Sequence, residues 1–401
     1  MRKVLYLLPF AALAMASCSN SDDVIVSSPV QNAEVKIFPQ VTGSTRGTIE
    51  TTASISEFRL ITNGKFGTAA GDDPSTLTIQ EYSMDVTKSA GSWTMGTPLY
   101  WGDATTAASF TAFAPKDATY SAGKLTNFTV DENDPAAHKD LIVAYNNGTK
   151  TDFTSGVPLH FQHALAQVIV NANYTFDSSI ETNYPDVTVK VKGIKFVNAD
   201  KTGTLTLPTS STVSGYTAAW TLSGTNTAKF ASEPTAAQTL SSTNALIDNS
   251  AAAGPMLLLP QTQAATTDLS ATTVTGAYLI AQVDIDYKEA QNVDYDGDGN
   301  TDTYKCIDLY PKPQTTPAAD QTAGEGTYDW IAVPVNIDWK AGYKYTYTLN
   351  FSNAAFGKIA PESTTEPGNA DEPIVPEQLK PVTFLVTVES DWTEQNINSS
   401  F

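Results

Sequence analysis

The chain has 401 residues and two cysteines, so a disulfide framework is excluded and burial of apolar side chains must stabilise the fold. Its formal net charge of -20 argues against nucleic acid as a partner, because phosphate backbones carry the same sign. Charged residues make up 16% of the chain, below the roughly one quarter that is usual. This composition suits a secreted all-β protein.

Residues 1–17 predict a lipoprotein signal peptide. The basic start MRK precedes the apolar run VLYLLPFAALAMA (4–16), which is too short to cross a bilayer as a helix. The stretch MASC (15–18) resembles a bacterial lipobox, in which Cys18 is lipidated and becomes the first residue of the mature protein. Several acyl chains on one residue would anchor the protein stably to a membrane. An ordinary cleaved secretory signal is the alternative.

Residues 18–33 are expected to form a polar tether. Its SNSDD run (19–23) resembles the surface-export signal of Bacteroidetes lipoproteins, which predicts display on the outer membrane at the cell surface. A simple polar spacer, which any lipoprotein needs, is the alternative.

Apolar and polar residues alternate with a period of two along much of the chain, while helical periodicity is nearly absent. The clearest strands are predicted at 279–287, 343–351 and 383–388. In VTVKVKGIKF (187–196) the alternation changes phase at Gly193, which predicts a β-bulge. Short half-buried strands between Gly, Pro, Asn and Asp turns favour antiparallel sandwiches or barrels.

The predicted strands divide into two antiparallel β-sandwich domains, expected at 34–155 and 156–401. The segment 361–381 is rich in proline and acidic residues, so we expect a mobile linker that separates the terminal strand from the rest of the protein.

The stretch PLHFQHALAQVIVNANY (158–174) holds two of the three histidines. Its Val-Ile-Val run favours a strand, which would place His160 and His163 on opposite faces and exclude a shared metal ion. The third histidine, His138, lies in an acidic stretch, where we expect it to be solvated.

Part of this stretch, LHFQHALAQVIV (159–170), resembles the Phe-x-His-Ala-x-Ala-x-Val signature of the fimbrillin-like proteins of Bacteroidia. Further segments resemble that family in the expected order and cover most of residues 30–392. A proline that often follows Tyr-Trp in the family is missing after Trp101. The further segments are LYWGD (99–103) with ASFTAFAP (108–115), KDLIVAY (139–145), LLLPQ (257–261), DWKAGYKYTYTLNF (338–351) and TFLVTVESDW (383–392).

The resemblance implies two sandwiches of transthyretin-like topology and a subunit or anchor of type V pili in the cell-surface fimbrium. It also implies assembly with other pilin subunits by donor-strand exchange. In that process an arginine-specific protease removes the N-terminal segment with its first strand. The vacated groove then accepts a strand from another subunit.

The residues needed for this process have candidates in the sequence. Cleavage between Arg46 and Gly47 would remove the lipid anchor and the predicted strand VKIFPQV (35–41), leaving an open sheet edge. The alternatives are that Arg46 is an ordinary loop residue and that the terminal strand folds back onto its own chain. In the terminal strand the candidate donor side chains are Phe384, Val386 and Val388.

The acidic stretch DYDGDGNTD (294–302) predicts a weak structural Ca²⁺ site, because oxygen ligands at this spacing suit that ion. Lys305 stands where an EF-hand loop needs a bidentate glutamate, and the flanking strands 279–287 and 304–310 predict a hairpin. A solvated hairpin tip is the alternative, and the family resemblance says nothing about this loop. The candidate ligands are Asp294, Asp296, Asp298, Asn300 and Asp302.

No nucleophile, phosphate-loop or zinc motif occurs in the sequence, so we expect a structural protein rather than an enzyme. The alternative is a monomeric surface lipoprotein that binds a host glycan or protein. Its contacts would be aromatic, although packing in the core is the commoner role of such residues. The candidates are Trp93, Trp101, Trp220 and Trp330.

The Ca²⁺ site is tested by calorimetric titration of the protein. We expect binding with a dissociation constant on the order of 10⁻⁴ to 10⁻³ M. Replacing Asp296 and Asp298 with Asn should abolish the heat of binding, because the site loses two carboxylate charges. Absence of binding at millimolar Ca²⁺ would reject the site.

Overall fold

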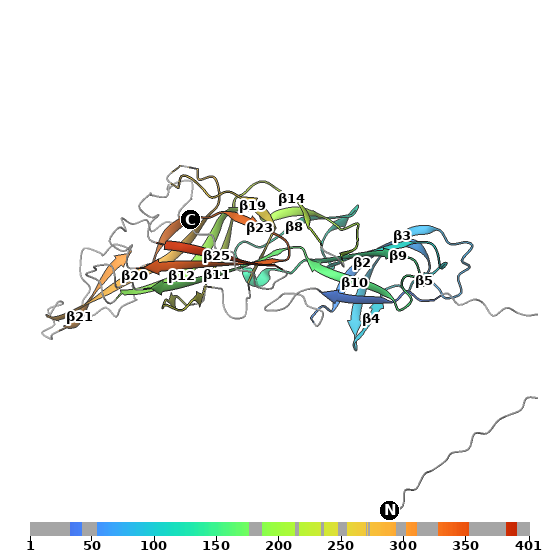
Figure 1. Cartoon of the computed structure of the whole chain (residues 1–401), viewed down its shortest axis with the longest axis horizontal. Coiled ribbons are helices and arrows are strands. Elements are labelled where there is room, and N and C mark those ends of the chain that lie inside the picture. The colour runs from blue at the N-terminus through green and yellow to red at the C-terminus, as the bar shows by residue number, and fades with distance from the viewer. Residues whose placement is uncertain are drawn as a thin grey trace, which may run out of the picture.

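The computed structural model describes residues 33–41, 54–175, 187–212, 216–233, 236–247, 255–269, 271, 273–293, 302–310, 328–352 and 382–390. Within these ranges the fold is all-β, as predicted, and helical structure is limited to short 3-10 segments such as Pro135–Ala137. No helix in the described part is long and apolar enough to span a membrane. The molecule is elongated (Figure 1).

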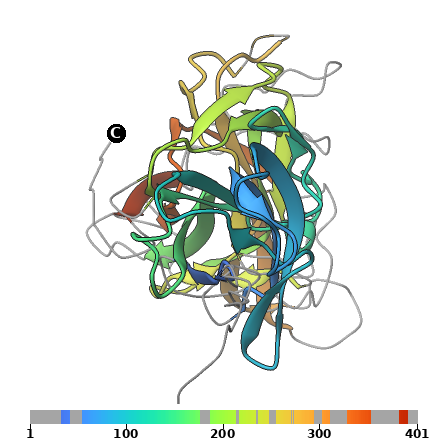
Figure 2. The same cartoon turned by 90° about the vertical axis from the view of Figure 1, so that its right-hand side faces the viewer.

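The first sheet lies at one end of the molecule and encloses its own core. Figure 2 looks onto this end, where the blue and teal strands twist strongly across one another. Phe58, Phe110 and Phe161 are fully buried on the inner face of this sheet. In spatial order the strands are β1 (Ile37–Val41), β10 (Val157–His163), β9 (Ile142–Gly148), β6 (Ala108–Ala114), β2 (Glu57–Gly67), β3 (Ile79–Ser89) and β4 (Ser92–Met95), with β5 (Tyr100–Trp101) beside β2.

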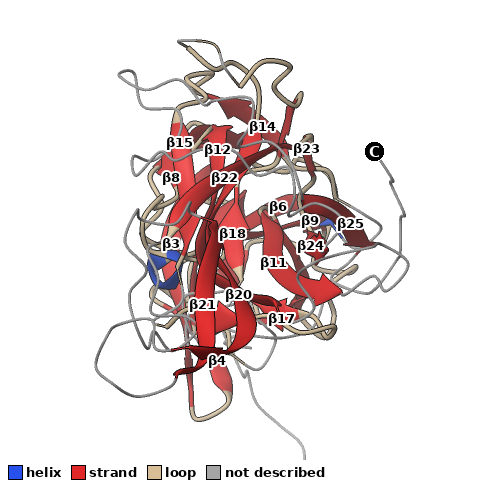
Figure 3. Cartoon of the chain, turned by 90° about the vertical axis from the view of Figure 1, so that its left-hand side faces the viewer, coloured by secondary structure: helices blue, strands red, loops and turns tan. Residues whose placement is uncertain are grey.

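At the other end two sheets face each other, as Figure 3 shows, and buried side chains from both sheets form a second core. Across this core the rings of Phe196 and Tyr347 meet edge to face with centroids 4.8 Å apart. One sheet has the order β17 (Ala245–Leu246), β11 (Ala166–Thr175), β24 (Tyr343–Ser352) and β25 (Val382–Ser390), with β18 (Met256–Leu258) beside β11. The facing sheet has the order β15 (Ala228–Ser232), β12 (Val187–Ala199), β20 (Tyr278–Val293) and β21 (Asp302–Tyr310), with β16 (Gln238–Thr239) beside β12 and β22 (Asp329–Pro334) beside β20.

A smaller sheet joins the two ends of the molecule. Its strand β8 comes from the N-terminal half and pairs with β13 from the C-terminal half. Phe113 of the first sheet stacks on Tyr120 of this one, with ring centroids 6.0 Å apart. The order is β14 (Ala219–Leu222), β13 (Thr202–Thr206), β8 (Lys124–Thr129) and β7 (Tyr120–Ser121); a separate pair is β19 (Gln261–Gln263) with β23 (Ile337–Trp339).

Several local expectations are confirmed. In β24 the residues Tyr345, Tyr347, Leu349 and Phe351 are buried, as the alternation predicts; Tyr343 on the same face is half-buried, and Thr348 on the other face is also buried. The register of β12 against β20 shifts between Val191 and Gly193, which is the predicted bulge.

The stretch 158–174 contains two strands rather than one. Strand β10 pairs with β9 in the first sheet, whereas β11 pairs with β24 in the second. The chain therefore passes from one sheet to the other between His163 and Ala166. The expected boundary at 155 assigns β10 to the C-terminal sandwich, but its backbone pairs with the first sheet.

Two strand pairs are parallel within an otherwise antiparallel set of described strands. They are β1 with β10 and β11 with β24. Period-two alternation reports which face of a strand is buried but not its direction, so the sequence could not predict them.

Candidate assembly edges and the junction between the sheets

Strand β1 forms one edge of the first sheet. It pairs with β10 from Ile37–Val157 to Val41–Phe161. Just before it, the Val35 N–H donates to Leu99 O at 2.8 Å, so the segment 33–41 contacts two separate parts of the sheet.

The side chains of this segment alternate strictly. Val35 and Ile37 are buried, with 2% and 6% of their surfaces exposed, while Phe38 points outward and is 47% exposed. The Phe38 ring lies against Gly156, which has φ of +124° and no room for a Cβ. The segment 33–41 therefore covers the edge of β10 with its backbone and buries Val35 and Ile37 in the core.

The proposed processing site follows this strand along the chain. Arg46, Gly47 and the lipidation candidate Cys18 lie outside the residues that the structure describes. All three remain predictions.

The candidate donor strand, β25, is the edge strand beside β24. Its backbone pairs antiparallel with β24, so that Phe384 faces Leu349, and Val386 faces Tyr347. In the single chain the strand therefore folds back onto its own sheet. The side chains of Phe384, Val386 and Val388 lie outside the described part, and their role as donors stays a prediction.

The acidic stretch lies between two strands that form the predicted hairpin. Strands β20 and β21 pair antiparallel, ending with Val293 opposite Asp302. Residues 294–300, with four of the candidate ligands, and the side chain of Asp302 lie outside the described part, so the Ca²⁺ site stays a prediction. Among the described residues no group of three or more His, Cys, Asp or Glu side chains gathers as a metal site.

His160 and His163 lie on opposite faces of β10, as predicted. His160 is half-buried on one face, and His163 is 4% exposed on the other. The Nδ1 atom of His163 lies 2.8 Å from Oδ2 of Asp140, which is also buried. The histidine of the Phe-x-His-Ala segment thus contacts the aspartate of the Asp-Leu segment, so two stretches that resemble the family meet in one buried pair.

The expectation for His138 is wrong. This residue is 5% exposed, because the segment 130–141, which we call the junction loop, folds against β18. Its Nε2 contacts Asp131 O at 2.7 Å, and its Nδ1 accepts the Leu257 N–H at 3.0 Å. Since Nδ1 is an acceptor, the neutral ring with a proton on Nε2 satisfies both contacts. Sequence shows acidic neighbours of His138 but not the backbone N–H from β18.

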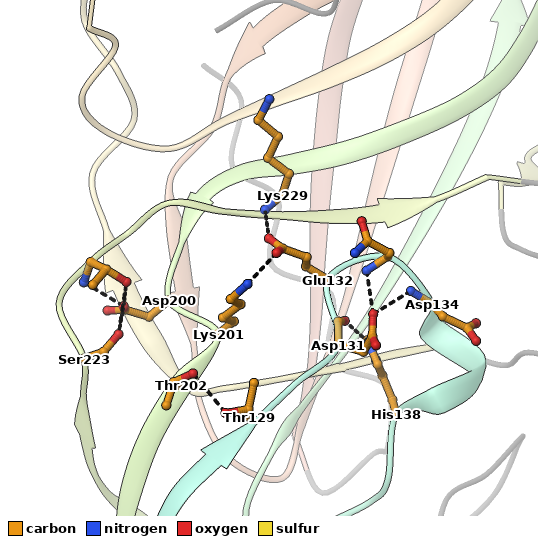
Figure 4. A network of polar contacts seen from close by, with 12 residues as sticks. Thr129, Asp131, Glu132, Asp134, His138, Asp200, Lys201, Thr202, Ser223 and Lys229 are labelled. Carbon is orange, nitrogen blue, oxygen red and sulfur yellow. Dashed lines mark hydrogen bonds and ion pairs between the residues drawn. The ribbon is translucent and has the colours of Figure 1, made fainter. Parts of the chain in front are cut away.

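The junction loop also contacts strands of the C-terminal half through Glu132 (Figure 4). Its carboxylate forms an ion pair with Lys201 and accepts the backbone N–H of Lys229 at 3.1 Å. The backbone continues the connection, because Val130 N–H donates to Lys201 O at 2.9 Å. Side chains and backbone together therefore hold the junction loop to the strands that follow it.

A second polar centre lies beside it at Asp200, which is 2% exposed. Its carboxylate accepts the Ser223 hydroxyl at 2.6 Å and the backbone N–H groups of Gly224 and Thr225 at 3.1 and 3.0 Å. Figure 4 shows this group next to the junction loop. Because its donors are N–H and O–H groups, Asp200 organises the turn after β14 and is not arranged to bind a cation.

The four tryptophans considered for glycan binding pack into or against cores. Trp101 and Trp330 are buried, and Trp93 and Trp220 are half-buried against apolar clusters. Trp220 also donates from Nε1 to Ala164 O at 2.8 Å, at the point where the chain leaves the first sheet. These contacts favour structural roles.

The fold defines an elongated all-β protein with two edge strands near the ends of the described chain. The model of the fimbrillin-like family matches residues 41–367, more than half of the sequence, and the protein therefore belongs to the fimbrillin-like family. The resemblance predicted from sequence segments is confirmed. Membership indicates a cell-surface fimbrial protein that assembles with other pilin subunits.

Two solved structures are similar over most of their length. A fimbrial protein from Bacteroides vulgatus ATCC 8482 is 16% identical, with 90% of this chain and 99% of that chain covered and a TM-score of 0.46. A fimbrilin from Porphyromonas gingivalis W83 is 12% identical, with 92% and 99% covered and a TM-score of 0.35. No curated protein sequence matches this chain. The family assignment rests on the family model.

His138 is expected to make stability depend on pH. Burial lowers the pKa of its imidazole, although Asp131 and Asp134 oppose the shift. Below the pKa of about 6.5 that the ring has in the unfolded chain, the unfolded chain therefore binds a proton that the folded chain does not. The free energy of unfolding then decreases as the pH is lowered, until the pKa of the folded state is reached. We expect His138→Gln to flatten this dependence, by up to about 1.4 kcal/mol per pH unit.

The measurement is the unfolding midpoint of wild type and His138→Gln at several pH values between 7.5 and 5. Glutamine keeps a donor and an acceptor but does not titrate in this range, so the difference isolates one ring. Parallel curves for the two proteins would contradict the assignment.

Proposed function

We propose that this protein is a structural subunit of cell-surface fimbriae that polymerises by strand exchange after proteolysis next to Arg46. The observation that carries the proposal is the position of β1 on the edge of the first sheet, with Val35 and Ile37 buried. In sequence, Arg46 stands between β1 and β2, so one cut there would separate β1 from the remainder of the chain.

The distribution of arginine supports a single cut. The chain has three arginines, Arg2, Arg46 and Arg59. Arg2 belongs to the predicted signal peptide. Arg59 lies in β2, which pairs with β3 and β6 on its two sides, and its Nε is 2.9 Å from Asp85 Oδ1. Because proteases need an accessible, extended segment, Arg59 within the paired strands would be a poor site, which leaves Arg46 as the proposed one.

Loss of the segment before Gly47 would have two physical consequences. The β10 edge from Val157 to Phe161 would lose its backbone partners, and the core would lose the side chains of Val35 and Ile37. An open edge beside an apolar groove favours strand addition, because the incoming backbone restores hydrogen bonds and its alternate side chains fill the groove.

The terminal strand is the proposed donor. Strand β25 is an edge strand in the single chain, and the 361–381 segment precedes it in sequence. Its sequence places Phe384, Val386 and Val388 on one side, which matches the alternation of buried residues in β1. A β25 strand from another subunit would then replace β1 along β10.

Before processing, lipidation of Cys18 would hold the subunit on the outer membrane. The role is structural rather than catalytic, and adhesion would come from the assembled fimbria. Family membership supports the fimbrial part of the proposal; an arginine-specific protease, the lipid anchor and a host ligand belong to the proposal itself.

Arg46→Ala should keep the protein lipidated at Cys18 and monomeric, because β1 would stay attached and continue to cover β10. Arg46→Lys is the matched control. It keeps the positive charge but not the arginine side chain, so it should also resist an arginine-specific protease and stay monomeric. The measurement is the fibre content and N-terminal residue of protein sheared from cells. Wild type should begin at Gly47, and fibres formed by Arg46→Ala would reject the proposal.

A further inference from the structure

Part of β10 is joined to its neighbour β9 through side chains instead of a backbone ladder. Among the described residues, β9 and β10 pair directly only where Gln162 and His163 lie. Near the start of β10, Pro158 has no N–H to donate, so the backbone hydrogen bonds to β9 cannot continue through it. The Asn146 side chain of β9 bridges this gap, donating from Nδ2 to Pro158 O at 2.8 Å.

The other bridge is Thr212, which comes from the loop between β13 and β14. Its hydroxyl donates to His160 O at 2.6 Å and accepts the Tyr145 N–H at 3.2 Å, so one oxygen joins β10 to β9. Its carbonyl accepts from Gln162 Nε2 at 3.0 Å. Thr212 is 1% exposed, although it lies outside both strands. A residue of the C-terminal half therefore fills the space where the first sheet splits.

The opposite edge of the same stretch belongs to β1. Residues 157–161 pair with residues 37–41, and the Val157 N–H donates to Lys36 O at 2.7 Å. If β1 leaves, this stretch keeps the burial of its inward side chains and the bridges from Thr212 and Asn146. Without β1, residues 157–161 would have no backbone pairing to a neighbouring strand on either side among the described residues.

We propose that Thr212 is a positioning residue that keeps β10 extended when β1 is absent, so that its edge remains ready to receive another strand. This inference rests on the proposed function. A preformed edge favours strand uptake, because the ordering of the acceptor does not then oppose binding. Without the hydroxyl, the His160 carbonyl and the Tyr145 N–H would both lose a buried partner, which favours local opening.

The test uses the full chain, before and after treatment with an arginine-specific protease. Hydrogen exchange is measured by mass spectrometry in fragments that cover β10, and capture of the synthetic peptide AEVKIFPQV (33–41) is measured on the cleaved protein after its own N-terminal segment is removed. Thr212→Val removes the hydroxyl at nearly constant volume. In the cleaved form we expect about tenfold faster exchange in β10 and about tenfold weaker peptide capture than wild type.

Two variants control for general loss of stability. Thr212→Ser keeps the hydroxyl and should behave as wild type. Thr62→Val removes another hydroxyl that is 1% exposed and donates to a backbone carbonyl, Ser109 O at 2.8 Å, but lies in β2. It should leave β10 exchange and peptide capture unchanged.

The two proposals fail in different ways. Wild-type protein that is not cut at Arg46, or does not polymerise after the cut, rejects the proposed function. The role of Thr212 is then tested by hydrogen exchange in the intact chain, where the β10 amides of Thr212→Val should exchange faster than those of Thr62→Val. Equal β10 exchange in these two variants, or wild-type peptide capture by cleaved Thr212→Val, overturns the role of Thr212.

Discussion

Strand β10 is held on both edges by contacts from other segments of the chain, and the organisation of the first sheet depends on this arrangement. On one edge β1 supplies a parallel backbone ladder, and on the other Thr212 and Asn146 bridge the split from β9. An exposed strand edge is a template for pairing with another chain, so a stable monomer must cover it. Here the cover is a terminal segment that a single backbone cut would detach.

The described contacts between the two halves of the chain do not depend on β1. Strand β8 pairs with β13, the junction loop contacts β18 through His138, and Trp220 donates to Ala164 O. None of these contacts involves β1. If β1 were removed as proposed, the rest of the first sheet would therefore keep these contacts with the C-terminal half.

The buried pair of His163 and Asp140 gives a structural reason for two of the segments that resemble the family, because each segment supplies one member of the pair. The two residues lie 2.8 Å apart, at the end of β10 and just before β9. Burying two ionisable side chains is favourable only when each has a partner, so changing one without the other would be strongly destabilising. The segments that resemble the family thus report a structural constraint at the junction of the sheets.

The sequence by itself determined the all-β class, the opposite orientation of His160 and His163, the buried face of β24 and the bulge at Gly193. It did so because period-two alternation directly records which side of a strand faces the core. The family could also be inferred from ordered local segments. Local sequence was misleading for His138, whose acidic neighbours suggested solvent, because burial depends on what packs over a residue.

Only the tertiary structure decided which strands are neighbours and in which direction they run. The parallel pairing of β1 with β10, the acceptance of the Leu257 N–H by His138 over 119 positions and the contact of Thr212 with His160 over 52 positions join residues remote in sequence. Such contacts depend on the closure of long loops and on the packing of whole sheets, and no local pattern encodes them. For that reason the strand β1 could be predicted from the sequence, while the contact of Thr212 with its neighbour β10 could not.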